Sequence, residues 1–156
     1  MEIDLYDFRY GHEAVAFRTL IQAAPIHVPM NERVPTVEGN AFELKAWYGH
    51  WIATKQGRTA HDPTHLQVEA IDEFQATIPW SQLDEAVFLY AQEGKDLIKG
   101  YPLRLYVPHG SSECLHVKSV VKMWFLDAPD LGHEATYGFK NAISIEQLMQ
   151  DSQKRK

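Results

Sequence analysis

Apolar and polar residues alternate along several segments of this chain, and such alternation is typical of β-strands with one buried face. Residues 2–8 follow this pattern with one slip, and they predict a first strand. Residues 66–70 and 74–78 alternate more clearly on either side of the sequence Ile-Asp-Glu, which predicts a β-hairpin. A further strand is predicted within residues 87–97, with a tight turn at Glu93-Gly94.

Helical spacing is found near both ends of the chain. Residues 12–24 predict a short amphipathic helix that ends before Pro25. Apolar residues in this segment stand at positions i, i+3, i+4 and i+7, namely Phe17, Leu20, Ile21 and Ala24. A second helix is predicted from Ser144, because Ser144 and Gln147 have the spacing of a capping box and the basic tail suits the negative end of the helix dipole.

The segment between the first helix and the hairpin has no clear period. Residues 26–40 contain Pro29 and Pro35, so we expect an extended edge or a loop there. Residues 41–53 are apolar and aromatic, which we interpret as a buried strand pair or a bend. Its aromatic residues are expected in the core or at an interface, and they are Trp47, Tyr48 and Trp51. These elements together predict an α+β fold made mainly of mixed β-sheets, with a few short helices.

The composition fits one globular domain, which we expect to span residues 1–156. A net charge of −6 argues against a nucleic-acid partner, because proteins that bind the phosphate backbone need a basic surface. Any anion site must therefore be local. Cys114 is the single cysteine, which excludes an internal disulfide and thiolate-rich zinc or iron–sulfur sites. No segment reads as a secretory leader or a membrane span, so we expect a cytoplasmic protein without a membrane partner.

The candidate chemistry gathers in residues 100–125, with the sequence GYPLRLYVPHGSSECLHVKSVVKMWF. Two alternating stretches flank a polar loop that contains glycine and ends near Cys114, His116 and Lys118. This pattern predicts two strands whose connecting loop opens onto the main pocket. Arg104 lies between apolar strand neighbours, where a guanidinium could bind a phosphate through two N–H groups, and Lys118 supplies a second cation.

Four ordered pieces of sequence resemble a known family. The segment FQATIPWSQLDEAVFLYAQEGKDL resembles a segment that leads into a strand with the pattern LAYxxNGxxL. The segment GYPLRLYVP resembles the pattern GxPxRLxVP. HVKSVVKMWF is similar to xVKxVxxIxx, and DAPDLGHEATYGF resembles GxWExxGY. Together these pieces resemble the C-terminal half of the molybdopterin-binding domain of the sulfite oxidase family of oxidoreductases, most clearly over residues 67–140. The resemblance implies a sulfite-oxidase-like molybdopterin-binding fold.

The resemblance also implies a cofactor site. Arg104 would contact the phosphate of a molybdopterin, and His116 and Lys118 would border the pterin. Lys99 stands where family members often have histidine, and this substitution keeps a cation. The cofactor-binding set that we expect is Lys99, Arg104, Ser112, Cys114, His116, Lys118 and Ser119.

The sequence departs from the family at the metal ligand. Active members hold molybdenum through a cysteine thiolate in the first half of the domain, and this chain has no cysteine before Cys114. Cys114 belongs to the later loop, so ligation through it would need a geometry that the family does not use. Glu93 also stands where the family commonly has asparagine. We therefore expect no molybdenum ligand and assign no catalytic residue.

The sequence is compatible with several functions. The chain could be a relative of sulfite oxidase-type enzymes that holds the pterin without competent molybdenum chemistry. It could instead be a non-catalytic binding module for another small anion or a protein partner, including a second copy of itself. A third alternative is a subunit that docks on a separate chain carrying the missing half of the metal site. For Arg104, Lys118 and Ser119, a solvated strand face explains the pattern without any ligand.

Two further motifs contain histidine. His61 and His65 have the i, i+4 spacing of two metal ligands on a helix, and Asp62 is the nearest third donor. Pro63 disfavours a helix there, which leaves a zinc site in a loop as the alternative. His133 and Glu134 are adjacent and point apart on a strand, so we expect them at the surface rather than as an acid–base pair.

Overall fold

β-strands make up most of the regular structure of the computed structural model, which describes residues 1–55 and 61–140. In chain order they are β1 (Glu2–Asp7), β2 (Gly11–Ala16), β3 (His27–Pro29), β4 (Asn40–Glu43), β5 (His65–Ala70), β6 (Phe74–Pro79), β7 (Val87–Gln92), β8 (Lys95–Asp96), β9 (Arg104–Tyr106), β10 (Val120–Leu126) and β11 (Thr136–Phe139). The helices of the described residues are α1 (Phe17–Ala23) and α2 (Leu44–Ala53). The predicted α+β class with mainly β-sheets is confirmed. In the described chain, no helix has the length and apolarity that a membrane crossing requires.

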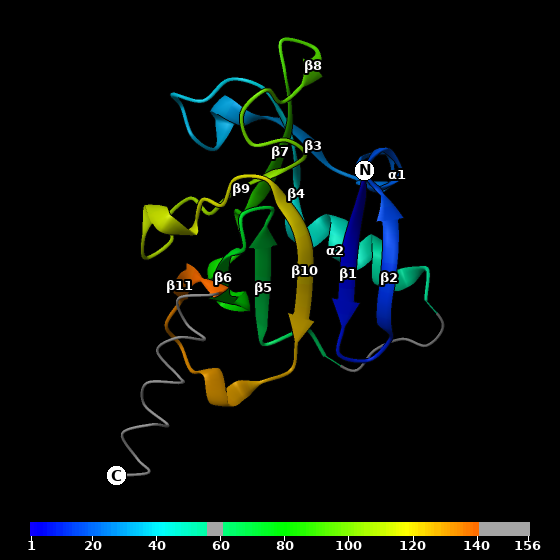
Figure 1. The fold of residues 1–156 in the computed structure, drawn as a ribbon, viewed down its shortest axis with the longest axis vertical. Helices are drawn as coiled ribbons and strands as arrows, with labels where there is room; N and C mark the ends of the chain where they lie inside the picture. Colours follow the sequence, from blue (N-terminus) through cyan, green and yellow to red (C-terminus); the bar gives the residue numbers. More distant parts are fainter. Residues whose placement is uncertain (56–60, 141–156) are drawn as a thin grey trace.

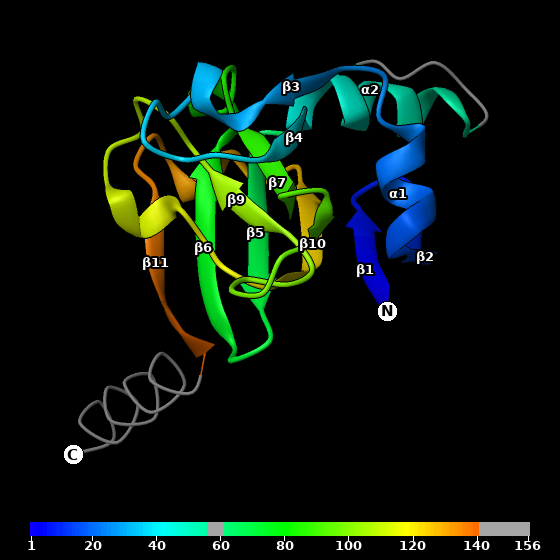
Figure 2. The same ribbon diagram turned by 90° about the horizontal axis from the view of Figure 1, so that it is seen from above.

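The strands form two sheets (Figure 1). The larger sheet has the order β11-β6-β5-β10-β1-β2; its neighbours β1 and β10 run parallel, while its other neighbouring strands run antiparallel. The smaller sheet has the order β3-β4-β7-β8, and β9 also pairs with β7. Seen from above, β11 lies at the outer edge of the larger sheet, and the short β3 lies next to β4 and near α2 (Figure 2).

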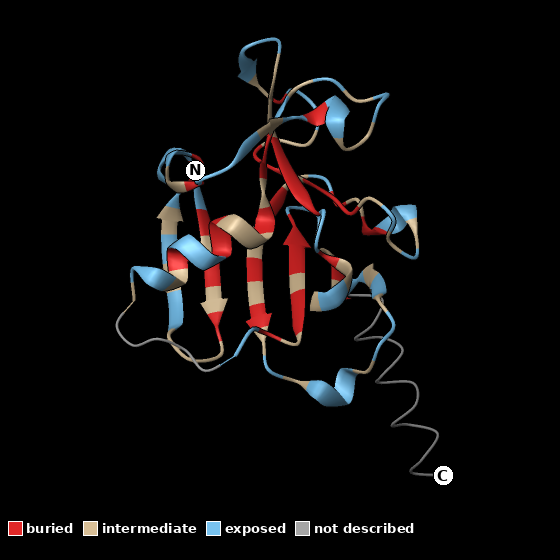
Figure 3. Cartoon of the chain, turned by 180° about the vertical axis from the view of Figure 1, so that it is seen from behind, coloured by how far each residue is buried: buried red, intermediate tan, exposed pale blue. Residues whose placement is uncertain are grey.

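Helix α2 crosses one face of the larger sheet, and its buried side packs on β10 (Figure 3). The ring of Tyr48 lies 4.3 Å from that of Phe125, and the ring of Trp47 lies 6.0 Å from it, measured between centroids. The interpretation of residues 41–53 as a strand pair or a bend is therefore wrong from Leu44 onward, whereas residues 41–43 do belong to strand β4. The buried residues of α2 do have helical i, i+3, i+4 and i+7 spacing, and they are Leu44, Trp47, Tyr48 and Trp51. The predicted burial of the three aromatic residues is confirmed.

The predicted helix over residues 12–24 is wrong in its first half. Residues Gly11–Ala16 form β2, and α1 begins at Phe17. Strand β2 pairs with β1 along its whole length, from Asp7 opposite Gly11 to Glu2 opposite Ala16. This ladder of hydrogen bonds outweighs the weak helical preference of six residues, because propensity is a small term beside tertiary pairing.

Other predicted elements are confirmed. The strand near the N-terminus is β1, and the predicted hairpin is formed by β5 and β6, which pair antiparallel. The turn after β7 is formed by Glu93 and Gly94, with φ angles of 53° and 73°. The predicted strands of residues 100–125 are β9 and β10, although β9 contains three residues only. The helix predicted from Ser144 lies outside the described residues.

Candidate functional site

Arg104 begins β9 and its side chain passes over Gly100. A Cβ atom on Gly100 would lie 2.3 Å from both Cγ and Cδ of Arg104, and the φ angle of Gly100 is +89°. Both constraints require glycine at this position. The guanidinium carbon of Arg104 lies 5.3 Å from the centroid of the Tyr106 ring, which is within cation–π range. The half-buried Arg104 makes no ion pair with any carboxylate of the residues that the structure describes.

His116 packs beside Tyr106, with 5.0 Å between the ring centroids. The backbone N–H of Val107 donates to Nδ1 of His116 over 2.9 Å, so this nitrogen carries no proton and Nε2 carries the hydrogen of the neutral ring. Burial lowers the pKa of His116; the Glu113 carboxylate opposes this shift and the Arg104 charge adds to it. The side chain is therefore a neutral hydrogen-bond donor beside the guanidinium at neutral pH.

Lys118 follows Val117, whose carbonyl accepts a hydrogen bond from the N–H of Leu105 over 2.8 Å. Lys118 is exposed and makes no ion pair within the described part of the chain.

Lys99 and Ser119 are both connected to Gly100, the glycine over which the Arg104 side chain passes. Lys99 immediately precedes Gly100, and the N–H of Ser119 donates to the carbonyl of Gly100 over 3.2 Å. Lys99 is exposed and, like Lys118, has no carboxylate partner among the described residues. Lys99, Arg104 and Lys118 therefore lie on segments that meet at Gly100, Arg104 through its side chain and the two lysines through their places next to Gly100 and Ser119 in the sequence. We call these three cations and His116 the Arg104 cluster.

Ser112 and Cys114 belong to a single 3-10 turn in the same loop. The N–H of Cys114 donates to Oγ of Ser112 over 3.1 Å, which closes this turn at Glu113–Leu115. The Cys114 side chain is exposed. The hydroxyl of Ser112 is thus used by its own turn, and neither residue makes a hydrogen bond to the Arg104 cluster in the described structure.

Three cavities of the described structure lie elsewhere. One of about 520 Å³ lies between the β1–β2 turn and the end of α2, and it is lined by His12, Glu13, Trp51 and Lys55 among others. Two others, of about 350 and 370 Å³, adjoin β8. The loop between β9 and β10 lines none of these three cavities, and its predicted opening onto a pocket stays a prediction. The Arg104 cluster is a surface site, since Tyr106 fills the space beneath it as part of an apolar cluster that includes Met30 and Leu89.

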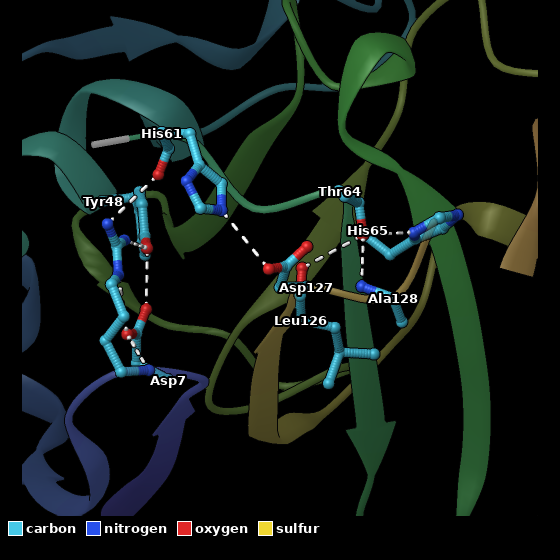
Figure 4. A network of polar contacts seen from close by, with 9 residues as sticks. Asp7, Tyr48, His61, Thr64, His65, Leu126, Asp127 and Ala128 are labelled. Carbon is cyan, nitrogen blue, oxygen red and sulfur yellow. Dashed lines mark hydrogen bonds and ion pairs between the residues drawn. The ribbon is translucent and has the colours of Figure 1, made fainter. Parts of the chain in front are cut away.

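A polar network that the sequence did not indicate ties the β1–β2 turn to α2 (Figure 4). The hydroxyl of Tyr48 donates to Oδ2 of buried Asp7 over 2.7 Å, and the guanidinium of Arg9 donates to the hydroxyl over 2.8 Å. The Arg9 side chain also donates to the carbonyl of His61 over 3.1 Å. Burial raises the pKa of Tyr48, and its hydrogen bond to Asp7 adds to this shift. The network is saturated, and its role is to anchor α2.

The two histidines of the HDPTH motif turn to different partners (Figure 4). His61 Nε2 lies 3.3 Å from Oδ2 of Asp127 at the surface, whereas buried His65 places Nε2 at 2.8 Å from the carbonyl of Gly132 and Nδ1 at 2.8 Å from the Thr64 hydroxyl. The zinc hypothesis is wrong for this arrangement, and no other group of three His, Cys, Asp or Glu side chains that could hold a metal occurs among the described residues. His133 and Glu134 are exposed, as expected.

Comparison of the sequence with models of known protein families and with curated proteins finds no match to either. The geometry can nevertheless be tested against the cofactor that the resemblance implies. The Arg104 cluster offers only cations and N–H donors, which suits a phosphate. Molybdenum would need a positioned thiolate, and Cys114 is an exposed residue of a 3-10 turn away from the first half of the chain. The residues therefore fit the phosphate of such a cofactor and do not fit its metal.

Proposed function

We propose that this protein is a non-catalytic binding domain with a sulfite-oxidase-like fold, and that the Arg104 cluster holds a small phosphate-bearing ligand, with a pterin phosphate as the first candidate. The four sequence pieces that resemble the sulfite oxidase family support this assignment, as does the mainly β architecture. The missing upstream cysteine favours binding over molybdenum chemistry.

The observation that carries the proposal is the absence of a counterion at Arg104. Every other arginine in the described ranges pairs with a carboxylate: Arg9 with Asp7, Arg18 with Asp96 and Arg33 with Glu43. Arg104 alone does not, although the whole chain carries a net charge of −6 and Arg104 is half-buried. A partly desolvated guanidinium without a partner is costly unless an anion from outside binds it.

The cluster is arranged to present donors in one direction. Tyr106 supports one face of the guanidinium, which leaves its N–H groups for two oxygens of one phosphate. Lys118 and Lys99 add point charges on flexible stems, and the neutral His116 ring adds one N–H donor. Glu113 carries a carboxylate whose charge acts on His116, and no described carboxylate pairs with Arg104. The cluster offers no activated nucleophile, so it supports binding rather than a reaction on the ligand.

The proposal is tested by calorimetric titration of a pterin phosphate into the wild-type protein and an Arg104→Ala variant at two salt concentrations. A charge-assisted contact contributes about 1.5–3 kcal/mol, so the variant should bind roughly tenfold more weakly or worse. Higher salt should weaken binding to the wild type more than to the variant. Two further ligands are titrated as controls. The pterin that lacks its phosphate measures the contribution of the ring, and inorganic phosphate measures the contribution of the anion.

Arg18→Ala is the matched control, because Arg18 is an exposed arginine whose partner is Asp96 at the β7–β8 hairpin. It should bind the pterin phosphate as the wild type does. Equal affinity of the wild type and Arg104→Ala, or no binding by either protein, rejects the anion site and leaves Arg104 as a solvated strand residue.

A further inference from the structure

Strand β11 is an open edge of the larger sheet. In the described residues it pairs with β6 and with no other strand, and it forms the outer border of the sheet in Figures 1 and 2. Its sequence Thr-Tyr-Gly-Phe contains neither a charge nor proline. Natural proteins usually protect such edges with charged residues, proline or very short strands, because free N–H and C=O groups pair with other strands.

The other outer strands of the two sheets carry this protection. Strand β2 contains Glu13, and β3 is a three-residue strand with Pro29. Strand β8 consists of Lys95 and Asp96 alone. Strand β9, which pairs with β7 alone, contains Arg104. Among the described outer strands, β11 is therefore the one with neither a charged residue nor proline within its bounds.

The backbone groups that face the open edge can be identified from the ladder. The N–H of Lys140 donates to the carbonyl of Glu73 over 3.0 Å, directly beyond the paired residues Phe139 and Phe74. Hydrogen-bonded and non-hydrogen-bonded pairs alternate along an antiparallel ladder. Gly138 is thus bonded to β6, whereas the N–H and C=O groups of Tyr137 and Phe139 point away from the sheet.

The side chains of these two residues form an exposed aromatic patch. Tyr137 is 50% exposed and Phe139 is 49% exposed, and both adjoin Phe74 with ring centroids 6.3 and 5.2 Å away. They project from the same face of β11 because they are two residues apart. An exposed aromatic pair beside unpaired backbone groups is typical of a protein interface.

We infer that β11 is a homodimer interface, at which two copies of this chain pair their β11 strands antiparallel across a two-fold axis at Gly138. This register places Tyr137 opposite Phe139 of the second copy, twice by symmetry, and each such pair exchanges two backbone hydrogen bonds through the groups that face outward. Gly138 meets its own copy at a non-hydrogen-bonded pair, where Cα atoms approach to about 4.5 Å and the missing side chain avoids crowding. Thr136 faces Lys140, so no like charges are opposed.

The inference is tested with the full chain by sedimentation equilibrium over a roughly hundredfold range of protein concentration, where a dimer appears as a mass that rises with concentration. Tyr137→Lys adds a charge to the edge and should raise the dissociation constant about tenfold or more. Phe139→Pro removes an N–H that points outward without removing a bond to β6, and it should also weaken the dimer. Ile98→Lys is the control, since Ile98 is 95% exposed in the loop that follows β8. Circular dichroism verifies that each variant is folded.

The register is tested by cross-linking. Gly138→Cys in a Cys114→Ser background should form a disulfide-linked dimer under mild oxidation, and much faster than Ile98→Cys in the same background. A protein that stays monomeric throughout the concentration series overturns the inference. So does a dimer that Tyr137→Lys leaves intact, or one in which position 138 cross-links no faster than position 98.

Discussion

The charged residues Asp7 and Arg104 differ in the hydrogen-bond and ion-pair partners that surround them. The Asp7 side chain is fully buried and accepts hydrogen bonds from Tyr48 and from the backbone and side chain of Arg9. Arg104 is half-buried, rests on Tyr106 and has no carboxylate partner in the described residues. A satisfied charge stabilises the fold and leaves nothing for a ligand, whereas an unsatisfied one keeps its hydrogen-bonding capacity. We therefore expect Asp7 to contribute to stability, and this contrast supports the proposed binding role of Arg104.

Tyr48→Phe is expected to lower the free energy of unfolding by about 1–3 kcal/mol, because it leaves the buried Asp7 carboxylate and Arg9 each without one hydrogen bond. Urea denaturation at neutral pH measures this loss. Tyr90→Phe is the matched control, since the Tyr90 hydroxyl contacts His27 over 2.9 Å at a more exposed place. The control should lose less than about 1 kcal/mol. Equal small losses in both variants would show that the Asp7 network adds little stability.

At the scale of elements, the turn between β7 and β8 sets a specific requirement on the residues that form it. Strands β7 and β8 are joined by two residues with positive φ angles, 53° at Glu93 and 73° at Gly94, which is the type I′ turn of a two-residue hairpin. Glutamate is strained in this conformation, whereas asparagine tolerates it.

Glu93→Asn is expected to raise the free energy of unfolding by roughly 0.5–1 kcal/mol, because it relieves the strain at φ 53°. Gly94→Ala should lower the free energy of unfolding by about 1–2 kcal/mol, although a Cβ atom there would meet no atom within 4 Å. Thermal and urea denaturation provide the measurement.

Gly49→Ala is the control for the glycine substitution. Gly49 lies in α2, and a Cβ atom there would also meet nothing within 4 Å. This variant should be more stable than the wild type by about 0.5–1 kcal/mol, because alanine favours the helix. The two alanine variants therefore test backbone conformation alone, and a change of the same sign in both would refute the assignment of the turn.

At the scale of the whole molecule, two sheets and α2 enclose a core in which aromatic rings of α2 surround Phe125. The Arg104 cluster lies on the connection between the sheets, since β9 belongs to the smaller sheet and β10 to the larger. The proposed dimer edge lies on β11, in the larger sheet. Binding of a ligand and pairing of two copies would thus use separate parts of the molecule.

The purified protein is expected to contain no stoichiometric molybdenum and to show no oxidation of sulfite, because no cysteine precedes Cys114 to supply the thiolate that the family uses. Elemental analysis after expression in a host that makes the cofactor measures this directly. About one molybdenum per chain would contradict the expectation and would make Cys114→Ser the next variant to analyse. Binding of the pterin phosphate without the metal would agree with the proposed function.

The sequence by itself determined the features that depend on neighbours along the chain. Period-two alternation placed β1, β5, β6 and β10, and the turn at Glu93-Gly94 followed from local conformational preference. The pattern of α2 was equally readable, since its buried residues have helical spacing, but the surrounding aromatic residues concealed it.

Only the tertiary structure decided which strands are neighbours. Alternation shows which face of a strand is buried and contains no information about its partner, because sheet hydrogen bonds join residues far apart in sequence. The parallel pairing of β1 with β10, the contact between Asp7 and Tyr48, and the separate partners of His61 and His65 could therefore not be predicted. The open edge of β11 has the same origin, since a strand is at an edge only in relation to the strands that the rest of the sheet has paired.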